Sequence, residues 1–386
     1  MRFFLFKPYI MYKLVTIAFL LSLISCIKQR DEIDVTWNIN LEKPVDKQIY
    51  ISGNQPFLGN WSPKSILLEK NDSLHWSFTN TVSKNTLLEY KFTLGDWNFQ
   101  AANENGIALE NMEVITPKKD TIINVNIKNW TSGNQLQEQG QITGTVEYIK
   151  DFHIDGLKDR DIIIWLPPSY KTNQTKRYPV LYMHDGQNTI DPRTSSFGVD
   201  WQVDETVTNL IENKKLQEII IVASYCTEDR NADYGDTKKG KLYRKSLAID
   251  LKKYIDIKYR TKPQKQHTAI AGSSMGGLVS FMSAWEYPEV YKGAICMSPA
   301  FKYEDFDYIN TITEDNKKDL ILYIDNGGKG VDIILQPGVE KMEKELLKKG
   351  YKLNDDLFVV FNKKAKHSEG DWALRFPYAI ELFFKK

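Results

Sequence analysis

Apolar and polar residues alternate in short segments over residues 33–130. Turn-forming residues separate these segments, which are Asp34–Leu41, Lys47–Gly53, Leu74–Val82, Leu87–Gly95 and Asp120–Trp130. A period of two places every second side chain on one face of a strand. About a hundred residues built from such strands are typical of a β-sandwich. We therefore predict an all-β sandwich domain over residues 33–130.

The pattern changes after residue 142, where continuous apolar runs alternate with segments of helical period. The apolar runs are Arg160–Tyr170, Tyr178–Gly186, Glu218–Cys226, His267–Ser274, Tyr291–Pro299, Asp319–Gly328 and Leu357–His367. The clearest helical segments are Val203–Leu216, Ser246–Tyr259 and Val339–Gly350. Buried parallel strands joined by crossover helices produce this pattern. Residues 142–386 are thus predicted to form an α/β domain with a mostly parallel sheet and helices on both faces. Its catalytic residues are expected in loops at the carboxyl ends of the strands.

Two further segments fall outside these domains. Residues 131–141 are polar and lack apolar periodicity, which predicts a linker. Residues 1–25 combine basic residues with a short apolar stretch, too short to span a membrane, and are predicted to be a signal peptide. The sequence Leu23–Cys26, "LISC", resembles the lipobox of bacterial lipoproteins, whose cysteine is lipidated; an ordinary signal peptide is the alternative. The resemblance implies export and a lipid anchor on Cys26 at the outer membrane, with either face open.

Charge and cysteine content narrow the class of protein. The chain has 51 Lys and Arg residues against 50 Asp and Glu residues, whereas a nucleic-acid-binding domain carries a strongly basic face. We therefore expect no nucleic-acid partner. Once Cys26 is set aside, Cys226 and Cys296 remain, each in a separate apolar run. We expect two buried free thiols in central strands, and no disulfide, despite the exported context.

The strongest chemical signal is the sequence "GSSMG" over Gly272–Gly276. It follows a predicted strand, precedes a predicted helix and places Ser274 at the centre of Gly-x-Ser-x-Gly. This is the pattern of a sharp turn that exposes a nucleophilic serine, and the glycines allow the strand and helix backbones to approach. Ser273 lacks this flanking pattern and is predicted to be a spectator. The alternative interpretation is a junction built from small residues without catalytic function.

A serine nucleophile needs a base, and the chain has five histidines. His367 alone follows the last predicted strand, where the Ser…Asp/Glu…His order of α/β-hydrolases places the base. The carboxylate that orients this imidazole is expected after the strand Asp319–Asp325. We favour Asp332, in the predicted loop, over Asp325 at the strand end. A surface histidine and a helix-capping aspartate are the alternative interpretations.

The same turn supplies candidates for an oxyanion hole. The N–H of Met275 follows the nucleophile at the start of a helix, where positive charge is concentrated. The second donor is expected in the loop "HDGQN", from the N–H of Gln187 or Gly186, unless that loop is a simple turn. Such chemistry requires no metal and no cofactor.

These motifs together resemble the putative-esterase family of the α/β-hydrolase superfamily. The matching segments are Ile162–Tyr170, Arg177–Asn188, Asp200–Thr206, Tyr254–Thr261, Ala269–Leu278 and His367–Trp372. The resemblance covers about Gly144 to Phe384 and includes siderophore, feruloyl and acetylxylan esterases. It implies a Ser-His-acid triad, with Ser274 and His367 matching directly. The acid motif departs from the family pattern, because "GGKGVD" is one residue longer.

The first predicted domain contains the segment "ISGNQPFLGNWSP", Ile51–Pro63, followed by "LLEYKFTLGDW". These segments resemble a starch-binding domain of the family-20 carbohydrate-binding modules, and the resemblance covers about Val35 to Trp130. It implies that Trp61 and Trp97 stack on sugar rings. The alternative is that both tryptophans belong to the core of a sandwich that serves as a spacer.

These features together predict an exported serine esterase that acts through Ser274, His367 and Asp332. Its partners would be an ester substrate, a membrane reached through Cys26 and a polysaccharide such as starch or a plant glycan. Carbohydrate-linked and siderophore esters are both candidate substrates. Two alternatives stay open: a glycan-binding lipoprotein with a relic hydrolase domain, and an acyltransferase that uses the same triad. The charged segment Ser224–Tyr243 is expected either to line the substrate pocket or to be a solvated loop.

Overall fold

A computed structural model describes residues 31–59, 61–104, 106, 108–109, 111–131, 142–196, 199–303 and 305–386. The chain divides into two compact units, Met1–Thr131 and Ser132–Lys386. The predicted signal peptide, Cys26 and all but the first residue of the predicted linker lie outside the described residues. Within the described part of the chain, no helix is both long and apolar enough to cross a membrane.

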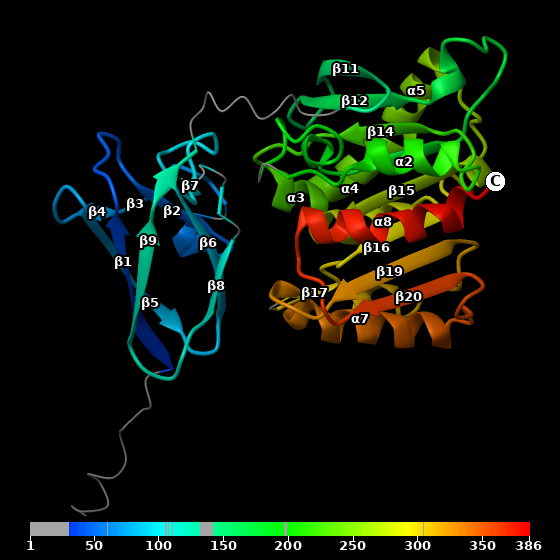
Figure 1. Ribbon diagram of the computed structural model, residues 1–386. Coiled ribbons are helices and arrows are strands. Elements are labelled where there is room, and N and C mark those ends of the chain that lie inside the picture. Colours follow the sequence, from blue (N-terminus) through cyan, green and yellow to red (C-terminus); the bar gives the residue numbers. More distant parts are fainter. Residues whose placement is uncertain are drawn as a thin grey trace, which may run out of the picture. The chain divides into compact units, whose positions relative to one another are not determined.

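The first unit contains two four-stranded sheets that share one core. Their strand orders are β4-β5-β1-β9 and β3-β2-β6-β8, and β10 pairs with β7 beside them. The strands are β1 Glu32–Leu41, β2 Tyr50–Gly53, β3 Ile66–Leu67, β4 Glu69–Lys70, β5 His75–Ser83, β6 Leu87–Thr93, β7 Ala101–Ala102, β8 Met112–Ile115, β9 Thr121–Ile127 and β10 Asn129–Trp130 (Figure 1). Strand β1 buries every second residue, as its sequence alternation predicts. Trp37 and Trp76 are fully buried between the sheets, so the predicted all-β sandwich is confirmed.

The second unit is built on one eight-stranded sheet. Its order is β11-β12-β14-β13-β15-β16-β19-β20, antiparallel at β11, β12 and β14 and parallel from β14 to β20 (Figure 1). The strands are β11 Thr145–Phe152, β12 Arg160–Leu166, β13 Val180–Met183, β14 Ile220–Ser224, β15 Thr268–Ser273, β16 Gly293–Met297, β19 Ile321–Gly327 and β20 Leu357–Asn362. A short hairpin, β17 Lys302–Tyr303 and β18 Phe306–Asp307, follows β16.

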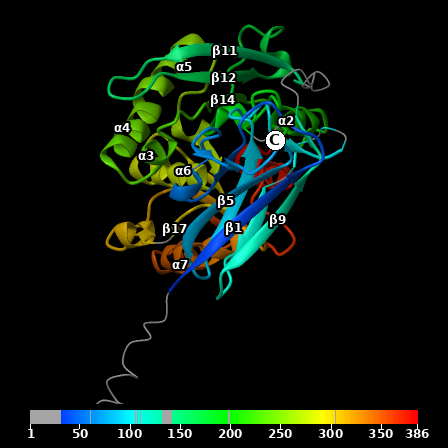
Figure 2. The same ribbon diagram turned by 90° about the vertical axis from the view of Figure 1, so that its left-hand side faces the viewer.

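Helices cover both faces of this sheet (Figures 1 and 2). They are α2 Val203–Glu212, α3 Arg230–Tyr234, α4 Lys238–Ser246, a π-helical turn Leu247–Leu251, α5 Lys252–Lys258, α6 Met275–Glu286, α7 Val331–Lys348 and α8 Glu369–Phe384. Helices α2 and α8 pack on one face, and α4 to α7 pack on the other. Neighbouring strand residues alternate between these two cores; in β12, Ile163 faces the first and Ile164 the second. The predicted α/β fold with a mostly parallel sheet is therefore confirmed.

Two local predictions were wrong. Strand β14 ends at Ser224, so Cys226 lies in the following loop and is only partly buried, whereas Cys296 is buried in β16. Both are free thiols. Helix α7 begins at Val331, earlier than the periodicity of the sequence indicated, so Asp332 lies in a helix and not in a loop. Gly330 precedes this helix with φ of +59°, a left-handed value that glycine adopts without strain.

Candidate active site

Ser274 occupies the turn between β15 and α6 in a strained backbone conformation. Its φ of +57° and ψ of −123° lie in a region that residues with a side chain rarely adopt. The turn is sharp enough that a Cβ atom on Gly272 would lie 2.6 Å from the Gly276 carbonyl carbon. A hydrogen bond from the Ser274 N–H to the Met297 carbonyl (2.9 Å) ties the turn to β16. Ser274 is partly exposed, whereas Ser273 ends β15 and is buried.

His367 and Asp332 are in direct contact, although 35 residues separate them in the chain. His367 follows β20, and its Nδ1 lies 2.6 Å from Oδ1 of Asp332. The Asp332 side chain is fully buried. Its second oxygen, Oδ2, accepts hydrogen bonds from the Gly327 N–H (2.8 Å) and from the Ser298 hydroxyl (3.1 Å). The carboxylate therefore has a donor on each oxygen and a fixed orientation toward the imidazole.

Asp325, the other candidate acid, has different partners. It lies within β19, where Arg375 Nε is 3.2 Å from its Oδ2 and the Tyr323 hydroxyl donates to the same oxygen (3.0 Å). The Ser298 N–H donates to Oδ1 (3.1 Å). Burial raises the pKa of Asp325 to about 6, while Arg375 acts in the opposite direction. The structure thus places Asp332, and not Asp325, on the imidazole of His367.

The two predicted oxyanion donors lie at the first residue of α6 and in the loop after β13, which pack together. Met275 is the first residue of α6, so its N–H has no acceptor within the helix. Gln187 lies in the 3₁₀ turn Gly186–Asn188, which follows β13. A Cβ atom on Gly276 would lie 3.1 Å from Asp185 Oδ2, which shows how closely the start of α6 approaches the loop after β13.

Side chains and backbone of Cys226, Arg230 and Tyr234 hold the Asp185–Gln187 loop in place, a contact that the sequence did not predict. Asp185 has a left-handed φ of +53°, and its carboxylate accepts two hydrogen bonds from Arg230 (2.7 and 2.8 Å). The Tyr234 hydroxyl accepts from the Asp185 N–H (3.1 Å). The Gln187 side chain is fixed by Cys226, which donates its N–H to Oε1 (3.1 Å) and accepts from Nε2 at Sγ (3.0 Å). The segment Ser224–Tyr243 therefore holds this loop in position through hydrogen bonds to Asp185 and Gln187.

One group of carboxylates in the described part of the chain has the spacing of a metal site. The atoms that Asp200, Asp204 and Glu205 offer lie within 4.8 Å of one another near the start of α2. Asp204 is fully buried; its Oδ2 accepts from the Thr143 N–H (2.6 Å). Acidic residues are also favoured in the first turn of a helix, so this group needs no ion to explain its position. Burial and the neighbouring Glu205 raise the pKa of Asp204 to about 8.

This raised pKa predicts a pH-dependent stability. The ordinary pKa is 3.8, so between about pH 4 and 8 folded Asp204 holds a proton that the unfolded chain has lost. The stabilisation is complete below the unfolded pKa and is lost as pH rises through 8. We expect the free energy of unfolding to fall between about pH 5 and 8, by at most about 1.4 kcal/mol per pH unit, and to level off above pH 8. Asp204→Asn should reduce this decline. Urea unfolding of both proteins in EDTA buffer tests this, and equal slopes would contradict it.

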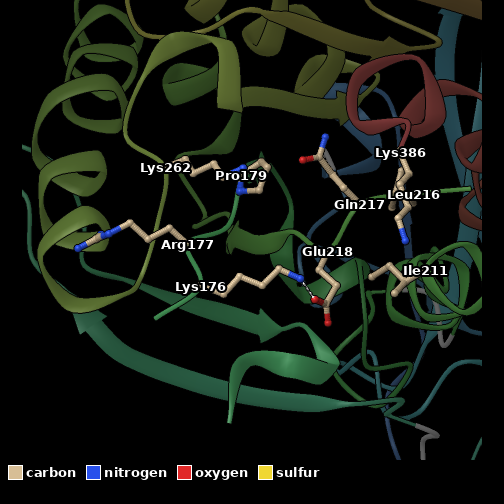
Figure 3. A pocket seen from close by; sticks show the side chains of 9 residues that line it. All are labelled: Lys176, Arg177, Pro179, Ile211, Leu216, Gln217, Glu218, Lys262 and Lys386. Carbon is tan, nitrogen blue, oxygen red and sulfur yellow. Dashed lines mark hydrogen bonds and ion pairs between the residues drawn. The ribbon is translucent and has the colours of Figure 1, made fainter. Parts of the chain in front are cut away.

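A basic hollow lies at the amino ends of the parallel strands, opposite to the end that carries Ser274 (Figure 3). Its lining residues are Lys176, Arg177, Pro179, Ile211, Leu216, Gln217, Glu218, Lys262 and Lys386. Lys176 turns toward Glu218, with which it forms an ion pair, and Arg177 points the other way (Figure 3). The cations do not converge on one point. This end of the sheet is remote from the carboxyl ends of β15, β19 and β20, which present Ser274, Asp332 and His367.

In the sandwich, Trp61 and Trp97 do not belong to the core. Both are partly exposed, whereas Trp37 and Trp76 are buried between the sheets. Trp61 follows the 3₁₀ turn Pro56–Leu58 and donates its N–H to the Gly53 carbonyl (2.8 Å). Trp97 lies in the turn after β6, and its carbonyl accepts from Gln100 Nε2 (2.8 Å). The interpretation of these two residues as core tryptophans was therefore wrong.

The mixed eight-stranded sheet, with a serine at the β15–α6 turn, defines the class of α/β-hydrolases. The chain belongs to the family described as "Putative esterase", whose model matches residues 157–381, more than half of the chain. It is a carboxylic ester hydrolase. Residues 32–126 match the family described as "Starch binding domain".

Individual proteins and solved structures are also similar to this chain. The endo-1,4-beta-xylanase/feruloyl esterase of Xylanibacter ruminicola is 30% identical over 134 residues, which are 33% of this chain and 18% of the relative. A solved ferulic acid esterase is similar in fold, with a TM-score of 0.53 and 19% identity over 63% of this chain and 98% of its own. The enterobactin esterase of Shigella flexneri, solved in the presence of enterobactin, has a TM-score of 0.52 and 11% identity, covering 91% of this chain and 92% of its own.

Proposed function

We propose that Ser274, His367 and Asp332 form a catalytic triad that cleaves carboxylic esters through an acyl-enzyme. One observation carries the proposal: the strained serine turn follows a strand of the same sheet as the strand that precedes an imidazole whose Nδ1 lies 2.6 Å from a buried carboxylate. A serine hydroxyl is a weak nucleophile at neutral pH and requires such a base. The Asp332 carboxylate accepts a hydrogen bond from the Nδ1 proton, and Nε2 of His367 is then the ring nitrogen that takes the proton from Ser274.

The first half of the reaction forms the acyl-enzyme. The Ser274 oxygen attacks the ester carbonyl carbon while His367 takes the hydroxyl proton. The carbonyl π electrons move to oxygen, and the N–H groups of Met275 and Gln187 donate to that oxyanion. The tetrahedral intermediate then collapses, the bond to the alcohol oxygen breaks, and His367 gives its proton to the departing alcohol.

The second half repeats these steps with water. His367 removes a proton from water, the hydroxide attacks the acyl carbon, and Ser274 leaves with the proton that His367 returns. The products are the free acid and the regenerated enzyme. Asp332 stabilises the imidazolium in both halves and is not itself protonated.

We propose an acyl group ester-linked to a polysaccharide as the substrate. The support is the starch-binding match of residues 32–126 and the name of the xylanase/feruloyl esterase relative. In the sandwich, the partly exposed Trp61 and Trp97 offer aromatic faces of the kind that sugar rings stack on. The sandwich would hold the polysaccharide while the α/β domain cleaves its esters.

A serine-directed probe and an ester panel test the two parts of this proposal. A fluorophosphonate should label the intact chain once, on the peptide that contains Ser274; labelling elsewhere would contradict the triad. The panel compares feruloylated and acetylated oligosaccharides, a catecholate siderophore ester and a simple aryl ester. Faster cleavage of the sugar esters and retardation in a starch or xylan gel are expected. Preference for the siderophore ester, or acyl transfer to an added sugar, would overturn the substrate or the hydrolytic assignment.

A further inference from the structure

Ser298 lies immediately after β16 in a position that no sequence motif marked. It is fully buried and has a left-handed φ of +42°, which is uncommon for a residue with a side chain. Its N–H donates to the Asp325 carbonyl (3.0 Å) and to Asp325 Oδ1 (3.1 Å). These two bonds fix the backbone of Ser298 against β19 and hold its side chain between α7 and α8.

The direction of each hydrogen bond at the Ser298 hydroxyl follows from its partners. Oγ lies 3.1 Å from Trp372 Nε1, 3.0 Å from Arg375 Nη2 and 3.1 Å from Asp332 Oδ2. Indole and guanidinium nitrogens only donate, so they occupy both lone pairs of the hydroxyl oxygen. The single hydroxyl proton must then point at Asp332. A serine hydroxyl has one proton and two lone pairs, and all three are used here, so the orientation of the Ser298 hydroxyl is fully determined.

This orientation matters for the carboxylate that contacts His367. Arg375 is buried and cationic, and it is hydrogen-bonded to the same hydroxyl group, that of Ser298, as Asp332. With the hydroxyl present, its oxygen satisfies Arg375 and its proton satisfies Asp332. Without it, the guanidinium loses an acceptor 3.0 Å away, and Asp332 Oδ2 becomes the acceptor open to it. The carboxylate would then turn away from His367. Trp372, whose ring meets the His367 ring edge-on at 4.9 Å, would lose its acceptor as well.

We propose that Ser298 is a positioning residue for the triad acid. Its hydroxyl keeps Arg375 from pairing with Asp332 and so holds the Asp332 carboxylate on the imidazole of His367. This inference rests on the proposed function, because it assigns Ser298 a part in catalysis only if Asp332 has one.

Ser298→Ala removes the hydroxyl and leaves the backbone conformation no more strained than before. The variant loses the hydrogen bond from the hydroxyl to the charged carboxylate of Asp332. From the free energy that such a bond contributes, we expect kcat on an aryl ester to fall about 10- to 100-fold. KM should change less than about two-fold, because the lost interaction acts on the transition state. The less stabilised imidazolium should shift the acidic limb of the kcat/KM profile to lower pH. A general structural defect would lower kcat without moving this limb.

Ser298→Gly is the second variant, since glycine adopts the left-handed φ without strain. It should fold even if Ser298→Ala does not, and it should show the same loss and the same pH shift. Ser246→Ala is the matched control: Ser246 is also fully buried, and its hydroxyl donates only to the Tyr243 carbonyl (2.8 Å). Wild-type kcat and pH profile in Ser298→Gly would overturn the inference, as would an unshifted acidic limb in both variants.

Failure of this inference can be told apart from failure of the triad. Asp332→Asn is measured beside the Ser298 variants. If Asp332→Asn collapses activity while the Ser298 variants match wild type, the triad is supported and the positioning inference is wrong. If Asp332→Asn is itself active, the proposed function fails, and the positioning inference fails with it.

Discussion

Ser274→Ala is expected to reduce kcat on a chromogenic ester by about 10⁶-fold, to a level set by the remaining oxyanion donors. The loss is large because alanine cannot form the acyl-enzyme, and no neighbouring group can replace it: Ser273, the next hydroxyl, is buried at the end of β15. Substrate binding should change little. Steady-state kinetics on purified protein measures this, with circular dichroism to establish that the variant is folded.

Ser273→Ala is the control for this variant. It changes the adjacent serine in the same turn and should retain kcat within a few-fold of wild type. Retention of more than one per cent of activity in Ser274→Ala would remove Ser274 from the nucleophile position. A complete loss in Ser273→Ala, together with an active Ser274→Ala, would reverse the assignment of the two serines.

The second large effect is expected from Asp332→Asn, with kcat reduced about 10⁴-fold. The amide is nearly the same size as the carboxylate, so the fold should persist. It carries no charge, however, and can donate a hydrogen bond to Nδ1 of His367. The imidazole would then be held in the tautomer whose Nε2 carries a proton and cannot accept one from Ser274. The measurement is kcat together with the unfolding midpoint in urea.

Asp325→Asn provides the comparison, because Asp325 is equally buried and was the other candidate acid. Its partners are Arg375 and Tyr323, so its loss should lower stability more than activity. We expect kcat within about ten-fold of wild type, since the partners described above for this carboxylate do not include the imidazole and link it to Asp332 only through Ser298 and Arg375. A loss in Asp325→Asn as large as that in Asp332→Asn would show that the acid had been misassigned.

Local patterns in the sequence predicted most of the fold. Alternation in Glu32–Leu41 and continuous apolar runs such as Ile220–Ser224 report burial on one face or on both, which is a local property. The turn that carries Ser274 could also be predicted, because its glycines, the strand before it and the helix after it lie within a few residues of one another. The single histidine after the last strand follows from chain order.

Other features depend on contacts between distant segments and could not be predicted. Arg230 meets Asp185 across 45 residues, and Ser298 meets Arg375 across 77. In the sequence, Arg230 is one charge in a polar segment and Ser298 one of several small residues. The early start of α7 was missed because the pattern Gly-Lys-Gly resembles a loop. Gly330 in fact caps the helix from a left-handed conformation that only the three-dimensional structure reveals.

The end of β16 is hydrogen-bonded to both Ser274 and Asp332, which lie far apart in the sequence. The Met297 carbonyl holds the N–H of Ser274, and the next residue, Ser298, holds the carboxylate of Asp332. One peptide unit therefore holds both the turn of the proposed nucleophile, Ser274, and the proposed triad acid, Asp332. A substitution that displaces this peptide would move both groups together. Attempts to redesign the nucleophile turn and the acid independently will consequently meet a shared geometric constraint at Met297–Ser298.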